Sequence, residues 1–375
     1  MYTPKVYRRA VGAMFFMAGI CFSSWASRIA TIQQKHSLNE AELGTVLFAI
    51  PVGLMISLPI ASWAIAKVGS RLVLAIGLAL YALTLITLGF APDVWTLAGC
   101  LVIFGLGSNA VNVSVNTQAV ATEAMYPKPI LASFHGLWSM AGFLGAGVGT
   151  VMIAQEVAPQ THFIIMSALI LVSIFICWPY LHNDKQPVKS GSAFVMPDKS
   201  LIILGLIAFC SMIVEGAMFD WTTIYFKKVV GATKEWEGAG YTAGMCFMAA
   251  GRFVADGFSH RFGLKRTLQV SGALSMCGLL IAVIFPTLIP AILGFMLVGA
   301  GISSVVPMIY SAAGRSTTMQ PGAAIAAVST ISFVGFLIGP PVIGLLAEVS
   351  SLKISFLFLA VMAALVVVFT TRAKV

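Results

Sequence analysis

The apolar stretch IPVGLMISLPIASWAIAKVGSR, residues 50–71, indicates the fold class of this chain. It carries no charged side chain before Lys67, and it ends in a short basic turn that contains Gly69 and Arg71. An apolar run of about 20 residues is long enough to cross a bilayer as a helix. Lys and Arg are enriched in cytoplasmic loops, so a basic turn is typical of the cytoplasmic end of such a helix. The stretch therefore predicts a transmembrane helix followed by a cytoplasmic loop.

The rest of the chain has the same character. Of its 375 residues, 59% are hydrophobic and only 9% are charged, and the mean hydropathy is +0.97. Soluble domains carry about 25% charged residues. This composition excludes soluble enzymes, nucleic-acid-binding proteins and disordered regulators. We therefore assign the net charge of +9 to cytoplasmic loops and not to a nucleic-acid partner.

Polar, Gly and Pro clusters separate the apolar runs into two sets of six, so we expect an all-α membrane protein with twelve transmembrane helices. The chain then divides into an N-terminal six-helix bundle (1–181), a polar cytoplasmic linker (182–199) and a C-terminal six-helix bundle (200–375). The predicted spans are 8–29, 42–65, 72–90, 95–121, 129–154, 161–181, 200–225, 237–259, 267–285, 288–313, 321–346 and 353–371.

The distribution of basic residues predicts the orientation. With the N-terminus inside, 15 of the 22 Lys and Arg lie on the cytoplasmic side, six lie on the outer side, and Arg252 lies within a span. Such an excess is typical of cytoplasmic loops. We expect a multi-pass protein of the cell (inner) membrane with both termini in the cytoplasm.

The two halves repeat each other at an offset of 194 residues. The turn at 66–71 has a counterpart at 260–265, and the glycines at 105 and 107 have counterparts at 299 and 301. Several matches at one offset indicate a duplicated six-helix unit. Many secondary transporters are built from such repeats, with the solute site near the midplane between them.

These basic turns resemble the loop motif of the major facilitator superfamily, roughly G-x-x-x-D-R-x-G-R-[RK]. The matching residues, for which the resemblance implies a gating role, are Lys67, Gly69 and Arg71 in the first copy and Arg261, Gly263 and Lys265 in the second. The aspartate of the motif is replaced by Ala66 and His260. Asp256 is a candidate replacement, and it also stands at i+4 from Arg252, with which it can pair.

A closer resemblance, to the MosC-like branch of this superfamily, covers nearly the whole chain. It rests on Ser24-Trp25-Ala26-Ser27-Arg28, on 42–48, on His135-Gly136 with 146–149, and on Glu215-Gly216 with Asp220-Trp221. The namesake of this branch is associated with rhizopine, an amino-cyclitol. The resemblance implies a secondary transporter, and it favours a sugar, a cyclitol or a related polar metabolite as the solute.

Candidate solute-binding residues in the N-terminal half are amides and aromatic side chains. Asn109, Asn112 and Asn116 are spaced by three and four residues and share one helix face. Hydrogen bonding between helices explains one buried amide, but three favour the lining of a cavity. Trp25 is either an aromatic-belt residue or a stacking surface for a sugar-like ring.

His135 and Trp138 share one face of the fifth span, three residues apart. Trp138 is a further candidate for solute contact. His135 is either a proton carrier or a residue that hydrogen-bonds a nearby loop.

The strongest candidates for chemistry are the two acids of the seventh span, Glu215 and Asp220. A charge near the bilayer centre costs about 2.5–3.5 kcal/mol, so an intramembrane acid is a functional candidate by default. Glu215 is the predicted proton-coupling residue and also a candidate solute ligand, because protonation removes its charge. Asp220 either assists it or forms an ion pair with Arg28 near the outer face.

The predicted function is therefore secondary active transport of a small polar solute, coupled to protons and working by alternating access. Two alternatives are a proton-coupled exporter of amphipathic or cationic compounds and a membrane receptor or scaffold that does not transport. The sequence contains no GxxxxGK[ST] motif, so we expect no ATP-binding loop. The six cysteines stand singly in apolar runs, so we expect no metal, and we expect no cofactor. The expected partners are the solute, protons and the lipid bilayer, and we expect a monomer.

Overall fold

The computed structural model describes residues 2–127, 130–183, 199–316, 319 and 321–373, and within them every regular element is helical. In this described part of the chain, eleven helical segments are long and apolar enough to span a membrane. The predicted eighth span corresponds to α10 (Ala239–Phe262), which is 24 residues long but carries Arg252 and Asp256. The all-α membrane fold expected from the sequence is confirmed. Most of the predicted linker, residues 184–198, lies outside the described residues.

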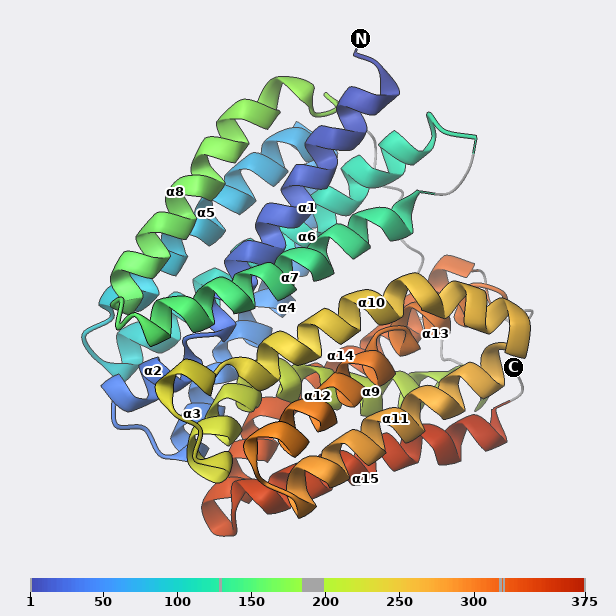
Figure 1. Ribbon diagram of the computed structural model, residues 1–375. Coiled ribbons are helices and arrows are strands. Elements are labelled where there is room, and N and C mark those ends of the chain that lie inside the picture. The colour runs from blue at the N-terminus through green and yellow to red at the C-terminus, as the bar shows by residue number, and fades with distance from the viewer. Residues whose placement is uncertain (1, 128–129, 184–198, 317–318, 320, 374–375) are drawn as a thin grey trace. The chain divides into compact units, whose positions relative to one another are not determined.

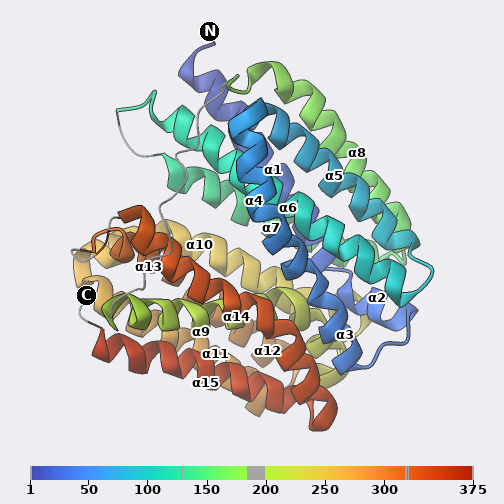
Figure 2. The same ribbon diagram turned by 180° about the vertical axis from the view of Figure 1, so that it is seen from behind.

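The chain forms two compact units. Unit 1 comprises residues 1–37 and 46–189, and unit 2 comprises residues 38–45 and 190–375. Unit 1 contains α1 (Pro4–Ala26), α2 (Ile29–Lys35), α4 (Ala49–Val68), α5 (Ser70–Phe90), α6 (Val94–Glu123), α7 (Leu131–Ala154), α8 (Pro159–Cys177) and the 3-10 turn η1 (Trp178–Tyr180). Unit 2 contains most of α3 (Glu40–Leu47), together with α9 (Lys199–Tyr225), the π-helical turn η2 (Phe226–Val230), the 3-10 turn η3 (Lys234–Trp236), α10, α11 (Leu264–Ile284), α12 (Leu288–Ile302), α13 (Val305–Ala313), α14 (Pro321–Val349) and α15 (Leu352–Arg372). Figures 1 and 2 show these helices from two sides.

The same pattern of helix pairing occurs in both units. In unit 1, α4 and α5 pack on α6, α1 packs on α7, and α5 and α1 pack on α8. In unit 2, α10 and α11 pack on α12, α9 packs on α14, and α11 and α9 pack on α15. Helices that occupy the same place in the two halves therefore have the same neighbours, as a duplicated six-helix unit requires.

Glycines at equivalent positions allow these close helix pairs. A Cβ added to Gly105 of α6 would collide with the carbonyl oxygen of Ile50, and one added to Gly299 of α12 would collide with the carbonyl oxygen of Gly244. Both pairs differ by 194 residues. Small residues let helix backbones approach closely in membranes, where van der Waals packing drives helix association. The repeat inferred from the sequence is thus present in the helix contacts themselves.

The basic turns also have the same backbone conformation. Gly69, between α4 and α5, has φ +88° and ψ 155°, and Gly263, between α10 and α11, has φ +82° and ψ 158°. Side chains with a Cβ rarely adopt positive φ, so glycine is required at both positions. The N–H groups of these glycines donate to Ile65 and Ser259, which are again 194 residues apart.

The second span is broken where the sequence predicts one continuous helix over 42–65. α3 ends at Leu47 and α4 begins at Ala49, with Phe48 between them. Pro51 lacks the N–H that would donate to the carbonyl of Leu47, which accounts for the break. Residues 40–45 of α3 belong to unit 2, where Gly44 packs closely against Pro340 of α14.

The exposed surface of α5 and α8 is apolar, as expected for helices that face lipid. Ile76 and Leu83 of α5 and Leu169 and Phe175 of α8 are all at least half exposed. A large exposed apolar surface is costly in water, and in a bilayer it contacts acyl chains instead. This side of unit 1 is therefore an unsuitable place for a polar solute.

Candidate functional site

Glu215 and Arg252 form an ion pair inside unit 2. Glu215 lies on α9 and Arg252 on α10, and an Nη atom of the arginine is 3.7 Å from a carboxylate oxygen of the glutamate. The side chains are only 13% and 20% exposed. The Nε–H of Arg252 also donates to the backbone carbonyl of Ser303, at 3.2 Å. The only acid near the middle of this span is therefore held by a cation from the adjacent helix.

This ion pair adds a partner of Arg252 that the sequence does not indicate. The i, i+4 spacing predicts that Arg252 can pair with Asp256 on its own helix, and the structure adds Glu215 of α9 as a partner. The side chain of Asp256 lies outside the described part of the chain, so its proposed pairing and its replacement of the motif aspartate stay predictions. At 3.7 Å the pair is longer than a hydrogen bond, so the attraction is mainly Coulombic.

Asp220 is a second buried acid on α9, one and a half helical turns after Glu215. It is only 8% exposed, and among the described residues it has no hydrogen bond and no ion pair. Tyr241 of α10 lies within electrostatic range of this carboxylate, and its own buried hydroxyl has no hydrogen-bond partner. Burying a polar group without a partner is costly, so such groups are candidates for contact with a proton, an ion or a solute.

The three amides of α6 differ in their surroundings. Asn112 is exposed and Asn116 is half-buried, and the Nδ2 of Asn116 donates to both the backbone and the side-chain oxygen of Asn112, at 2.8 and 3.1 Å. Asn109 is buried, and its Nδ2 has no hydrogen-bond partner. Asn112 and Asn116 therefore bond to each other along one helix face, and they retain donor and acceptor capacity toward the exposed side.

The aromatic candidates of unit 1 fall into two groups. Trp25, on α1, is fully buried 6.2 Å from the ring of Phe104, and its indole N–H has no partner. His135 and Trp138, on α7, are exposed and half-buried, and they contact Phe15 and Phe22 of α1 at ring distances of 5.3 and 6.0 Å. Of these three predicted residues, the two on α7 are accessible to a solute in this conformation, whereas Trp25 is not.

The residues of the basic turns contact aromatic rings and backbone carbonyls. The guanidinium carbon of Arg71 lies 4.3 Å from the ring centre of Trp178, and Lys67 lies 4.9 Å from that of Trp63. In unit 2, Arg261 lies 5.4 Å from the ring of Phe262, and Lys265 donates to the carbonyl of Thr371. Such contacts hold a cation at the end of a helix, and each is worth about 0.5–2 kcal/mol. The gating role implied by the family resemblance stays a prediction.

One pair in unit 1 escaped the sequence analysis. Arg28, only 2% exposed, donates from Nε to Nδ1 of the buried His162 and from an Nη atom to the carbonyl of Val157. His162 must then carry its proton on Nε2, which is buried and has no partner. A histidine accepts from this arginine in the position where a carboxylate is usual. Arg28 is therefore bound within unit 1, and an ion pair with Asp220 is not needed to account for its burial.

The described residues hold no group of three or more His, Cys, Asp or Glu side chains close enough to bind a metal ion. Unit 2 contributes an ion pair and a carboxylate without a cation to the candidate residues, and unit 1 contributes amides and aromatic rings. Such groups bind polar solutes and protons.

Comparison with known proteins identifies the family. The sequence profile of the Major Facilitator Superfamily matches residues 11–320 and 259–374. The chain belongs to this superfamily. The Major Facilitator Superfamily assignment makes the protein a transporter and not an enzyme.

Among its relatives in this superfamily is the membrane protein MosC of Rhizobium meliloti, which is 30% identical over 363 residues, covering 95% of this chain and 87% of the relative. An uncharacterised MFS-type transporter of Yersinia pestis is 31% identical over 342 residues, covering 91% and 89%. The predicted resemblance to the MosC-like branch is thereby confirmed.

Solved structures of other transporters share the fold. The nucleoside transporter NupG has a TM-score of 0.81 at 11% identity, covering 98% of this chain and 100% of NupG. A bacterial homologue of the human lysosomal transporter Spinster, in an inward-facing and occupied conformation, has a TM-score of 0.74 at 16% identity, covering 100% and 98%. At these identities the likeness shows the fold and leaves the solute open.

Proposed function

We propose that this protein is a proton-coupled secondary transporter that moves a small polar solute, such as a sugar, a cyclitol or a related metabolite, by alternating access. We place it in the cell (inner) membrane with both termini in the cytoplasm, on the 15-to-6 distribution of Lys and Arg. The observation that carries the proposal of proton coupling is the partly buried ion pair of Glu215 and Arg252.

The ion pair couples a proton to the position of a helix. When a proton binds Glu215, the carboxylate loses its negative charge and its Coulombic attraction to Arg252 disappears. Arg252 then keeps its hydrogen bond to the carbonyl of Ser303. The ion pair between α9 and α10 is therefore the interaction that weakens. A proton therefore stabilises conformations in which α9 and α10 move apart, and its release stabilises the one with the pair.

Asp220 supplies a second titratable group on the same helix. Its carboxylate has no competing cation among the described residues, so a proton or a solute amine is its natural partner. Protonation of Asp220 removes a buried charge, which lowers the cost of closing protein around it. We assign Glu215 as the main coupling residue and Asp220 as the assisting one.

The amides and aromatic rings of unit 1 are proposed as the solute contacts. Asn112 and Asn116 present donors and acceptors that match hydroxyl groups, and Trp138 offers a flat apolar face for a sugar or cyclitol ring. Asn109 and Trp25 add two buried N–H donors that lack acceptors in this conformation. Solute hydroxyls could satisfy them once the helices rearrange.

Counterflow in proteoliposomes tests the proposed transport. Purified protein is reconstituted, loaded with an unlabelled sugar or cyclitol, and assayed for uptake of the same labelled compound without a proton gradient. Asn116→Leu should weaken the apparent affinity for the transported solute while leaving protein yield unchanged. If no compound in a broad panel shows counterflow, the protein is a receptor or scaffold, and counterflow limited to lipophilic cations would favour the exporter.

Proton coupling is tested separately with Glu215→Gln. This variant should lose accumulation driven by a pH gradient and keep counterflow. Glu348→Gln is the matched control, because Glu348 is an exposed acid on α14 with no ion pair among the described residues. If Glu215→Gln accumulates the solute as the wild type does, with the same pH dependence, coupling does not involve this residue.

A further inference from the structure

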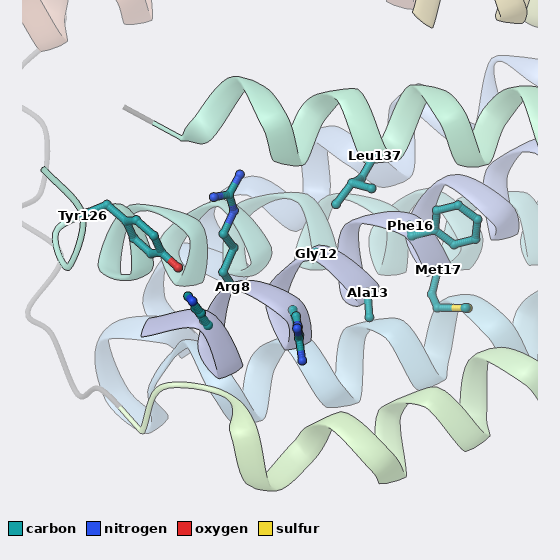
Figure 3. A pocket seen from close by; sticks show the side chains of 9 residues that line it. Arg8, Gly12, Ala13, Phe16, Met17, Tyr126 and Leu137 are labelled. Carbon is teal, nitrogen blue, oxygen red and sulfur yellow. The ribbon is translucent and has the colours of Figure 1, made fainter. Parts of the chain in front are cut away.

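A pocket of about 610 Å³ lies in unit 1, along the first half of α1. Figure 3 shows its lining, in which Arg8 points toward Tyr126, and Phe16 and Met17 lie farther along the same helix. Besides these residues, the lining consists of Lys5, Arg9, Gly12, Ala13 and Leu137. The volume is within the range of about 300–1,000 Å³ that is usual for ligand sites.

The charged end of the pocket contains three cations and no acid. Arg8 donates to the Oγ of Ser133, at 3.3 Å, and its guanidinium lies 5.5 Å from the ring centre of Tyr126, so its position is fixed. Lys5 and Arg9 are exposed, and among the described residues neither has a hydrogen bond or an ion pair. The pocket therefore has three positive charges that the lining does not neutralise.

The other end of the pocket is apolar. Gly12, Ala13, Phe16, Met17 and Leu137 contribute no polar side-chain atom. Met17 follows Arg9 by eight residues, which is about 12 Å along a helix. A ligand that fits this lining has an anionic group at one end and an apolar body of at least this length.

We propose that this pocket binds an anionic phospholipid, with the phosphate at Lys5, Arg8 and Arg9 and one acyl chain along Phe16, Met17 and Leu137. The charges lie at the beginning of the first span, which is the depth of lipid headgroups, and the apolar part extends toward the bilayer core. Clusters of Lys and Arg beside a transmembrane helix attract anionic headgroups. A bilayer supplies a ligand of this shape at high local concentration, whereas a small polar solute leaves the apolar end unfilled.

The cations also exclude some ligands. Lipophilic cations are repelled by three like charges, and a zwitterionic phospholipid gains less from them than an anionic one. The lining of the pocket shares no residue with the proposed solute contacts or with the acids of α9. It therefore does not depend on the proposed function.

The test measures the thermal stability of the purified full-length protein in detergent with added palmitoyl-oleoyl phosphatidylglycerol. A ligand that binds the folded state raises the melting temperature with its concentration. We expect a concentration-dependent rise with this lipid and a much smaller rise with phosphatidylcholine that has the same chains. Inorganic phosphate tests the headgroup alone, and dihexanoyl phosphatidylglycerol tests a headgroup with short chains.

Two variants test the two ends of the pocket. Lys5→Gln with Arg9→Gln should weaken the apparent affinity for phosphatidylglycerol by about 10- to 30-fold, because each basic residue near an anionic surface contributes about 1 kcal/mol. Arg266→Gln with Lys353→Gln is the control, since it removes two exposed cations from unit 2 and should leave the affinity unchanged. Ala13→Trp should fill the apolar end and abolish the effect of the long-chain lipid.

The outcomes separate the possible ligands. The proposal is supported if phosphatidylglycerol no longer raises the melting temperature of the Lys5→Gln, Arg9→Gln variant or of Ala13→Trp. The Arg266→Gln, Lys353→Gln control should respond to this lipid as the wild type does. An equal response to inorganic phosphate would show a free-anion site, and an equal response to phosphatidylcholine would show nonspecific lipid binding. Either result overturns the proposal. Native mass spectrometry of each variant gives a second measurement, the number of retained phosphatidylglycerol molecules, which should fall by one when the pocket is disabled.

Discussion

Neutralising either partner of the ion pair between Glu215 and Arg252 should destabilise unit 2, and neutralising both should restore part of the loss. At 3.7 Å the Coulombic attraction is about 4–5 kcal/mol at an effective dielectric constant of 20 and about 1 kcal/mol in bulk water. The side chains are 13% and 20% exposed, and their distance is too long for a hydrogen bond, so the lower half of this range applies. We therefore expect a coupling energy of about 1–3 kcal/mol.

A double-mutant cycle measures this energy. Glu215→Gln removes the negative charge that faces Arg252, and Arg252→Gln removes the positive charge that faces Glu215. A loss of about 2 kcal/mol lowers the melting temperature by about 4–8 °C for a unit of this size. The melting temperature of the double variant should be clearly higher than the value expected if the losses of the two single variants added. Tryptophan fluorescence of the purified protein follows the melting. Losses that simply add would mean that the two charges do not interact, and the proton-coupling argument would lose its basis.

Three further predictions concern packing and local hydrogen bonds. Gly105→Ala should destabilise unit 1 by about 1–3 kcal/mol, because the new methyl group meets a backbone carbonyl, whereas Gly99→Ala on the same helix has open space and should be neutral or stabilising in a thermal melt. His162→Ala should cost about 1–3 kcal/mol, because the Nε–H of Arg28 loses its acceptor, and His162→Gln should cost less if its amide oxygen takes over that bond. Asp93 caps α6 by accepting from the N–H of Thr96, which holds the pKa of its carboxyl below the ordinary value. The cap therefore stabilises the protein at pH values above the ordinary pKa of an aspartate. This stabilisation is lost as the pH falls through the lowered pKa of Asp93 in the folded protein. The difference in melting temperature between wild type and Asp93→Ala should accordingly shrink on acidification, and a constant difference would contradict the cap.

The fold could be predicted because its signals are local or periodic. Apolar runs of bilayer length mark the spans, and the glycines at 105 and 299 recur at one offset because a backbone contact at each position tolerates no side chain. The break in the second span was missed, although Pro51 carries its signal. The sequence shows that a helix loses a hydrogen bond there, but it does not show which unit α3 joins.

The partners within the candidate site could not be predicted in the same way. Arg28 and His162 are 134 residues apart in the chain, and no periodic pattern connects them. The rule for i, i+4 neighbours relates Arg252 to Asp256 alone, and packing of α9 beside α10 adds Glu215 as a partner that this rule cannot indicate. Residue type identified Glu215 and Asp220 as unusual in a span, but only the tertiary contacts show that one has a cation beside it and the other has none.

The repeat preserves packing but not charge, and this difference bears on where coupling occurs. α1 and α9 occupy equivalent places, and each has a buried tryptophan with an unpaired indole N–H, Trp25 and Trp221. The residue before the tryptophan is Ser24 in α1 and Asp220 in α9. Hydroxyl and amide groups keep their charge state at every physiological pH, whereas a carboxyl group can exchange a proton. Since both acids of this helix pair lie on α9, the coupling that we propose acts on unit 2, and the solute contacts that we propose lie on the uncharged polar residues of unit 1.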